Sequence, residues 1–207
     1  MKFSKIDDLT RPEHYYLRQD DVCYYLREYT PRAGFSHSGT NDIIQNFKKP
    51  VERRGKPEWR YKEQAVQQIA DELRSGMNPK WLRRATLVPM PPSAIKTDPR
   101  YDDRMVRVLK AVDRDAEYDI RELLVQIEST DPDHAVGPSG HRLSPEEREH
   151  LLTMDKSLVR PTPEQIGVVD DVLTNGSHFV AAKRVLQHQF PGVPVIGIFF
   201  ARREVVE

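Results

Sequence analysis

The chain has 207 residues, and its 32 basic and 32 acidic side chains give a formal net charge of zero, which argues against a general nucleic-acid or membrane-surface binder. Its length suits one α/β domain with a small appended segment. No apolar run is long enough to span a membrane, the N-terminus has no signal-peptide core, and the lone Cys23 excludes an intrachain disulfide framework, so we expect a cytoplasmic protein.

The N-terminal part of the chain has the least regular pattern. We predict that residues 1–57 form a small hood segment and that residues 58–207 form an α/β core. Within the hood, residues 22–26 are an apolar cluster compatible with a strand or a short helix. Residues 41–49 carry apolar side chains at helical spacing, which predicts a helix there.

Residues 48–62 contain seven lysines and arginines, interleaved with Trp59 and Tyr61. Such a mixture is typical of a platform for single-stranded nucleic acid. It is equally typical of a solvated loop that leads into a helix, and the zero net charge favours this second interpretation. A third interpretation is that some of these cations face a negatively charged substrate.

Three further elements are predicted before the middle of the chain. Residues 59–73 place apolar side chains on one helical face and are followed by a Ser-Gly pair, which predicts a helix and its end. Residues 84–89 predict a strand that runs into a proline-rich turn containing Ser93. Residues 105–112 carry an apolar stripe at helical spacing, which we interpret as core.

A polar segment rich in glycine and proline occupies residues 130–142. Long loops of this kind in compact domains are commonly lids, so we predict a mobile lid here. His134 or His141 is a candidate proton donor, and a metal site that includes Asp133 is the less favoured alternative. Ser144 then begins a capping box, which predicts a short helix.

The most informative pattern lies between residues 164 and 190. An apolar, β-branched run predicts a buried strand that stops on two adjacent carboxylates, Asp170 and Asp171. After a small polar turn, apolar residues at helical spacing predict an amphipathic helix over residues 179–190. Open α/β sheets bind ligands at the carboxyl ends of their strands, so the acids mark a candidate site. Residues 193–201 predict a second buried strand, with Arg202 and Arg203 just past it.

The turn after the two acids has the composition of an anion site. Backbone N–H groups at a helix N-terminus, aided by the helix dipole, favour phosphate. Asp170 and Asp171 can accept hydrogen bonds from two ribose hydroxyls or help to hold Mg²⁺. The pattern therefore predicts a sugar phosphate with free vicinal hydroxyls, and it matches neither the Walker loop nor the dinucleotide motif. The turn residues are Thr174, Asn175, Gly176 and Ser177.

Residues 168–177 resemble the phosphoribosyl-pyrophosphate (PRPP) motif of type I phosphoribosyltransferases, which has an apolar run, two acids, two apolar residues, Thr-Thr-Gly and a small residue. Two positions depart from that motif: Asn175 replaces the common second threonine, and His178 stands where another threonine is frequent. A fainter likeness, in residues 41–48 and 101–104, is to the ComF-type phosphoribosyltransferase-like group. This chain lacks the cysteines of the zinc ribbon that often precedes those proteins.

The resemblance implies an open, largely parallel sheet with helices on both faces and the hood over the acceptor site. It implies attack of a nitrogen nucleophile on C1 of PRPP, with release of pyrophosphate and Mg²⁺ as cofactor. Asp170 and Asp171 would be the catalytic residues that orient the ribose, and also the metal ligands. The implied 5-phosphate contacts are Thr174, Asn175, Gly176 and Ser177, and the implied pyrophosphate contacts are Ser93, Lys96, Arg104 and Arg142.

The expected partners are PRPP or a nucleoside monophosphate, together with an acceptor base or amine. No membrane partner is expected. Nucleic acid is a possible but less favoured partner, and homodimerisation is left open. Two alternatives to an enzyme stay open as well. One is a module that binds PRPP or a nucleotide and regulates another protein, and the other is a DNA-linked accessory role of the competence type.

Overall fold

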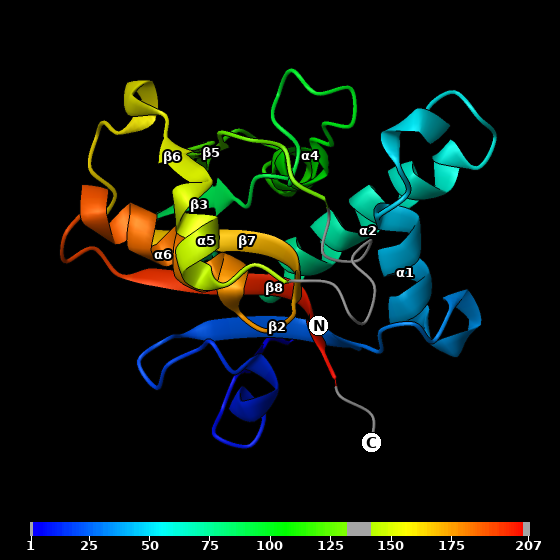
Figure 1. Cartoon of the computed structure of the whole chain (residues 1–207), viewed down its shortest axis with the longest axis horizontal. Helices are drawn as coiled ribbons and strands as arrows, with labels where there is room; N and C mark the ends of the chain where they lie inside the picture. Colours follow the sequence, from blue (N-terminus) through cyan, green and yellow to red (C-terminus); the bar gives the residue numbers. More distant parts are fainter. Residues whose placement is uncertain (1, 132–141, 205–207) are drawn as a thin grey trace.

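The computed structural model describes residues 2–131 and 142–204, so most of the predicted lid, residues 132–141, and its two histidines lie outside the described part. The described chain forms a six-stranded, mostly parallel sheet in the order β1-β2-β8-β7-β3-β4 (Figure 1). Only the first pair is antiparallel. The strands are β1 (Ser4–Lys5), β2 (Cys23–Tyr29), β3 (Ala85–Pro89), β4 (Asp119–Ile120), β7 (Gln165–Leu173) and β8 (Val195–Arg203).

A second, two-stranded antiparallel sheet consists of β5 (Leu124–Gln126) and β6 (Leu152–Met154). No helix among the described residues combines the length and the apolar character that a membrane span needs. The α-helices are α1 (Gly39–Phe47), α2 (Trp59–Gly76), α3 (Pro79–Leu82), α4 (Arg104–Val112), α5 (Pro145–His150) and α6 (Ser177–Gln189), and the 3₁₀ helices are η1 (Arg11–His14), η2 (Phe35–His37), η3 (Val51–Arg53) and η4 (Lys156–Leu158).

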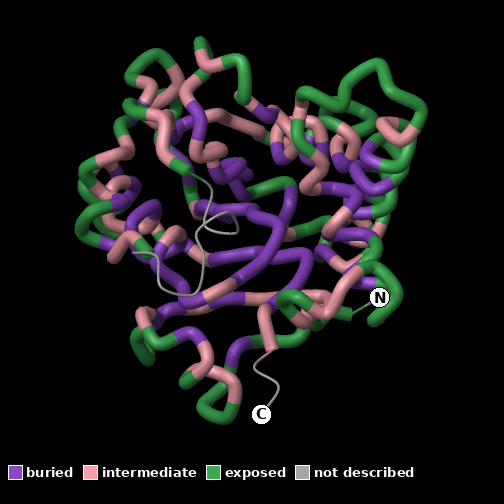
Figure 2. Tube along the Cα trace, turned by 45° about the vertical axis from the view of Figure 1, so that its right-hand side comes forward, coloured by how far each residue is buried: buried purple, intermediate pink, exposed green. Residues whose placement is uncertain are grey.

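Helices cover both faces of the main sheet, as the resemblance led us to expect. Side chains of α1, α2 and α4 pack against one face in a common apolar cluster, in which Ile44, Ile69 and Leu109 are fully buried. Helix α6 packs against the other face together with β5 and β6, where Phe179 and Leu186 are fully buried. The central strands are buried along most of their length (Figure 2), which explains why their sequences are continuous apolar runs instead of alternating ones.

The N-terminal segment belongs to the main sheet. Strand β2 pairs in parallel with β8 from Cys23 opposite Gly197 to Tyr29 opposite Arg203, and the two strands lie side by side in Figure 1. Helix α1 packs on α2. Strand β2, which lies in the predicted hood of residues 1–57, therefore belongs to the same sheet as the strands of the predicted core, residues 58–207. The pairing joins strands about 170 residues apart, and no local pattern indicates such a contact.

Most of the predicted elements are confirmed. The helices expected over residues 41–49, 59–73 and 179–190 correspond to α1, α2 and α6. The capping box is present at the start of α5, where the Ser144 hydroxyl accepts the Glu147 N–H at 3.2 Å and the Glu147 carboxylate accepts the Ser144 N–H at 2.7 Å.

Candidate functional site

A cleft of about 620 Å³ lies at the carboxyl ends of the parallel strands. Its walls come from segments that are far apart in the sequence: the ends of β2, β7 and β8, the turn after β3, Lys48 directly after α1, and residues of α4, α5 and α6. Because parallel strands bring their carboxyl ends to one edge, the polar residues that follow each strand meet there. The polar and charged lining residues include Thr30, Arg32, Lys48, Ser93, Asp102, Arg104, Asp131, Arg142, Arg148, Asp170, Asp171, Thr174, His178, Arg203 and Glu204.

The two adjacent acids lie in this cleft and face different surroundings. Consecutive strand residues point to opposite sides of a sheet. Asp171 turns toward α1 and α4, with Oδ1 3.1 Å from Lys48 Nζ and Oδ2 3.1 Å from Arg104 Nη2. Asp170 turns toward α6, with Oδ2 3.9 Å from His178 Nδ1, while its Oδ1 accepts the Asp171 N–H at 2.8 Å.

The different surroundings of the two carboxyl groups give them different pKa values. Burial, together with the charge of Asp171, raises the pKa of Asp170 to about 7. Burial also acts on Asp171, but Lys48 and Arg104 outweigh it and hold the pKa of that carboxyl below its usual value. At neutral pH the cleft therefore contains one firmly ionised carboxylate beside one that readily takes up a proton.

The turn after β7 presents only part of the predicted phosphate cradle to the cleft. Thr174 lines the cleft, whereas Asn175 and Ser177 are buried and face inward. The Asn175 Oδ1 accepts the Ser177 N–H at 3.1 Å and its hydroxyl at 2.9 Å, a side-chain arrangement that stabilises tight turns. The Ser177 Oγ in turn accepts a hydrogen bond from Arg148 Nε at 2.9 Å. These two side chains therefore build the turn, so that Thr174 and backbone groups are what the turn could offer to phosphate.

Gly176 is required by the shape of this turn. Its φ is +89°, and a Cβ at this position would lie 2.9 Å from the side chain of Leu17. We expect Gly176→Ala to lower the free energy of unfolding by about 2–4 kcal/mol, from left-handed strain plus overpacking. Gly55→Ala is the matched control, because Gly55 has φ +84° but no atom near its Cβ position, so only about 1–2 kcal/mol should be lost. Urea unfolding measures both, and equal losses would contradict the overpacking.

The N-terminal 3₁₀ helix η1 braces the same turn. His14 is fully buried, and its Nδ1 contacts the Thr174 carbonyl oxygen. The Tyr16 N–H donates to the Asn175 carbonyl at 3.1 Å, and the Asn175 amide donates to the Tyr15 hydroxyl at 3.3 Å. Burial lowers the pKa of His14, which keeps this ring neutral. No pattern in the sequence linked residues 10–16 with the turn.

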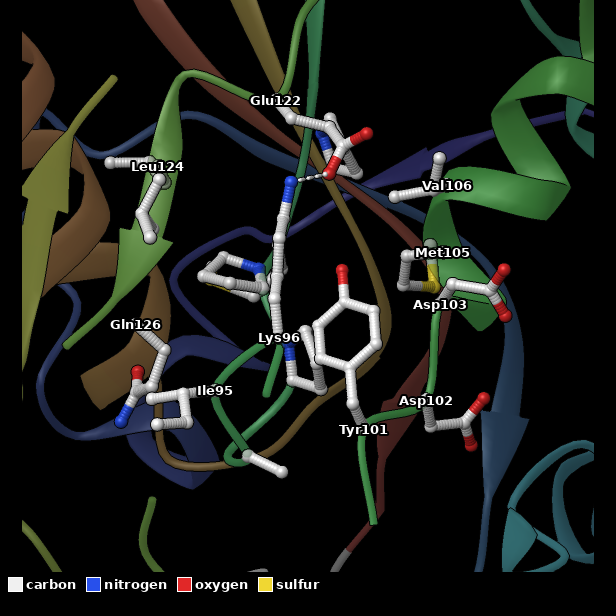
Figure 3. Close-up of a pocket in the computed structure, with 16 residues that line it drawn as sticks. Ile95, Lys96, Tyr101, Asp102, Asp103, Met105, Val106, Glu122, Leu124 and Gln126 are labelled. Atoms are coloured by element: carbon white, nitrogen blue, oxygen red, sulfur yellow. Dashed lines mark ion pairs between the residues drawn. The ribbon is translucent and has the colours of Figure 1, made fainter. Parts of the chain in front are cut away.

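Three of the four predicted pyrophosphate contacts reach the cleft, namely Ser93, Arg104 and Arg142. Lys96 does not. Its Nζ lies 2.8 Å from Glu122 Oε2 in a separate pocket of only about 20 Å³, where its side chain runs alongside Tyr101 (Figure 3). Lys96 therefore does not line the cleft that contains the two acids.

Other cations of the cleft were missed as site residues. Lys48 belongs to the predicted basic stretch, and Arg203 was expected next to the second buried strand and is the last residue of β8, so both had a signal in the sequence. Arg148 had none. Its guanidinium reaches the cleft from α5 and contacts both Ser177 and the Nε2 of His178. By contrast, Arg202 is held away from the ligand side by Glu13 and Glu28, at 2.8 and 2.6 Å, and does not line the cleft.

The basic stretch over residues 48–62 does not behave as one surface. Lys48 contacts Asp171, and Lys62 is fully buried. The two aromatic rings that a nucleic acid would need are covered by the protein's own cations, with Arg60 4.8 Å from the ring centre of Tyr61 and Arg54 5.5 Å from that of Trp59. This arrangement favours the third interpretation of the stretch, in which some of its cations face a substrate.

Direct metal binding by both acids fits this geometry poorly. Both oxygens of Asp171 contact cationic nitrogens, and the described residues contain no cluster of three or more metal-ligating side chains. A Mg²⁺ ion prefers oxygen ligands in octahedral geometry and commonly shares them with substrate phosphates. The carboxylates could therefore serve such an ion only alongside oxygens that a ligand brings.

Comparison with known proteins does not assign a family to this arrangement. No protein-family model matches the chain, and no curated protein shows significant similarity to it.

Proposed function

We propose that the cleft binds PRPP or a nucleoside monophosphate and that the protein transfers the phosphoribosyl group to a nitrogen nucleophile with release of pyrophosphate. The observation that carries the proposal is the meeting of two adjacent acids near the end of β7 with cations from the end of α1, from α4 and α5, and from the end of β8 in one cleft. A ligand that suits both needs hydroxyl donors for the acids and several negative charges for the cations. A sugar phosphate that also carries pyrophosphate has both.

The fold agrees with this proposal at a coarser level. A parallel sheet with helices on both faces places ligands at the carboxyl ends of its strands. The motif that resembles the PRPP site lies at the end of β7, next to the proline-rich turn after β3. We therefore propose that the fold is of the type I phosphoribosyltransferase kind.

In the proposed reaction the protein mainly positions the reactants and stabilises charge. Asp170 and Asp171 accept hydrogen bonds from the ribose hydroxyls, and their negative charge favours the developing oxocarbenium ion at C1. Thr174 and the turn backbone hold the 5-phosphate. Arg104, Arg142 and Ser93 hold the pyrophosphate as the C1–O bond breaks and the acceptor nitrogen forms its bond to C1.

Mg²⁺ is proposed as a cofactor that arrives with the ligand. When bound, it supplies positive charge to the departing pyrophosphate. The oxygens of PRPP would be its main ligands, and Asp170 is the better placed of the two acids to assist, because Asp171 already contacts Lys48 and Arg104.

Pyrophosphate competition distinguishes a transferase from a sensor. We expect inorganic pyrophosphate to displace PRPP in a calorimetric titration, and pyrophosphate release to appear when nucleobases and amines are supplied as acceptors. Arg104→Ala should weaken PRPP about tenfold or more, because a charge-assisted contact is lost, and should weaken a nucleoside monophosphate less.

Lys96→Ala serves as the control in the same titration. It removes a cation that lies outside the cleft, so PRPP affinity should stay within about twofold of wild type. If Arg104→Ala lowers the affinity for both ligands equally and the wild-type protein does not bind pyrophosphate, the enzyme proposal fails. A module that only senses a nucleotide is then the better description.

A further inference from the structure

Lys62 is a charged side chain in the interior, directly behind the cleft. It lies on α2, and its side chain has no exposed surface. Its ammonium donates to the carbonyl oxygens of Phe47 and Lys49, each at 2.8 Å, and to Asp102 Oδ2 at 2.6 Å. An ammonium has three N–H donors, so each of them has a protein acceptor.

The first arm of this hydrogen-bond network, from Lys62 to the Phe47 and Lys49 carbonyls, holds Lys48. The Phe47 and Lys49 carbonyls stand on either side of Lys48 at the C-terminal end of α1, where carbonyl groups lack helical partners and a positive charge is favoured. Holding both carbonyls fixes the backbone on each side of Lys48. The Lys48 ammonium then lies 3.1 Å from Asp171 Oδ1 in the cleft.

The second arm, from Lys62 through Asp102, holds Arg104. The Asp102 oxygen that accepts from Lys62 also contacts Arg104 Nη1, at 3.2 Å. The other end of the guanidinium, Nη2, lies 3.1 Å from Asp171 Oδ2. The guanidinium is also 5.4 Å from the ring centre of Phe47, which gives it an aromatic support. One buried ammonium is therefore linked through its contacts to both cations that flank Asp171.

A role limited to capping α1 does not account for this design. Burying a charge costs free energy, and apolar side chains in place of both Lys62 and Asp102 would fill the same space without that cost. The Lys62 side chain has no exposed surface, so the fold bears this cost, and the same burial lowers the pKa of Lys62. Both arms end at the same carboxylate and open onto the same cleft, so the network has an orienting role that a capping contact alone would not need.

We propose that Lys48 and Arg104 form a two-cation clamp for a pyrophosphate group and that Lys62, through Asp102, is its positioning residue. Asp171 holds the clamp from the strand side. An ammonium and a guanidinium each carry more N–H donors than these contacts use, so further donors remain for an anion. The pyrophosphate class rests on the proposed function, whereas the clamp itself rests on the contacts of these four side chains.

Calorimetric titration with inorganic pyrophosphate tests the clamp directly. We expect Lys48→Met and Arg104→Met each to weaken pyrophosphate by about tenfold or more, and Lys62→Met by about fivefold or more. In the Lys48→Met/Arg104→Met background, Lys62→Met should cause no further loss, because a positioning residue acts only through the residues that it positions. A purely structural lysine would not produce this lack of additivity.

Lys96→Met is the matched control, since it removes a lysine from an ion pair outside the cleft and should leave pyrophosphate affinity unchanged. If Lys62→Met does not fold, Asp102→Asn carries the same test, because it weakens the link to Arg104 while keeping the size of the side chain. Folded Lys62→Met or Asp102→Asn protein with wild-type pyrophosphate affinity would overturn the proposal, and so would wild-type protein that ignores pyrophosphate. Protein that binds pyrophosphate through the clamp but binds neither PRPP nor a nucleoside monophosphate would uphold the clamp and refute the proposed function.

Discussion

Asp171→Asn should destabilise the protein and weaken PRPP binding together. The substitution removes the negative charge between Lys48 and Arg104, which lie 3.1 Å from its two oxygens. Removing one partner of a buried ion pair leaves the others uncompensated, so we expect a loss of about 2–4 kcal/mol in the free energy of unfolding. We expect a value toward the lower end of the range for buried ion pairs, because the side chains of Lys48 and Arg104 are each about one-fifth exposed to solvent. PRPP affinity should fall more than about tenfold, since a ribose contact and an anchor of the two cations are lost together.

Urea unfolding at neutral pH and calorimetry with PRPP measure the two effects. Glu164→Gln is the matched control, because it makes the same carboxylate-to-amide change in an exposed pair with Arg84. The control should change stability by less than about 0.5 kcal/mol. Asp171→Asn protein with wild-type stability would show that Lys48 and Arg104 do not depend on this carboxylate.

Asp170→Asn is expected to act on stability in the opposite direction. Burial raises the pKa of Asp170 to about 7, so the folded protein favours the protonated form. The stabilising contribution of that form is fully present below pH of about 4 and is lost as pH rises through about 7. An amide has no charge to desolvate. At pH 8 the variant should therefore be more stable than wild type by up to about 4 kcal/mol, since the pKa of Asp170 lies about three units above its ordinary value and each unit corresponds to about 1.4 kcal/mol.

The stability gain of Asp170→Asn should shrink as pH falls and vanish near pH 4, which urea unfolding at several pH values would reveal. Groups unchanged by the substitution cancel in the comparison with wild type. PRPP affinity should nevertheless fall about tenfold at pH 8, because the carboxylate that accepts from the ribose is gone. A variant less stable than wild type at every pH would show that the Asp170 charge is compensated within the fold.

The two variants together separate the roles of the neighbouring acids. Both substitutions remove one formal charge and keep the side-chain size, yet one should stabilise the unliganded protein and the other destabilise it. The difference comes from the two sides of the strand: Asp171 faces two cations, and Asp170 faces His178 and the backbone of its neighbour. Equal effects on ligand affinity with opposite effects on stability would identify both acids as ligand contacts.

The sequence by itself predicted most of the longer helices and strands and the two acids of the candidate site. Periodicity is a local property, so the apolar runs of β7 and β8, the amphipathic helices α2 and α6, and the capping box of α5 could all be identified from neighbouring residues. The position of Asp170 and Asp171 in the C-terminal part of a buried strand followed from the same pattern, although β7 does not stop on them as expected and continues to Leu173. A parallel sheet then required that they lie where other strands also end.

Only the tertiary structure decided which side chains surround the acids. Lys48 and Lys62 belong to one basic stretch, yet one faces the cleft and the other is buried, because the packing of α1 on α2 separates them. Lys96 is only three residues from Ser93 in the sequence, but its side chain pairs with Glu122 and does not line the cleft. Burial and ion pairing depend on contacts between residues far apart in the chain, here Lys62 with Asp102 and β2 with β8, and local sequence patterns carry no information about such contacts.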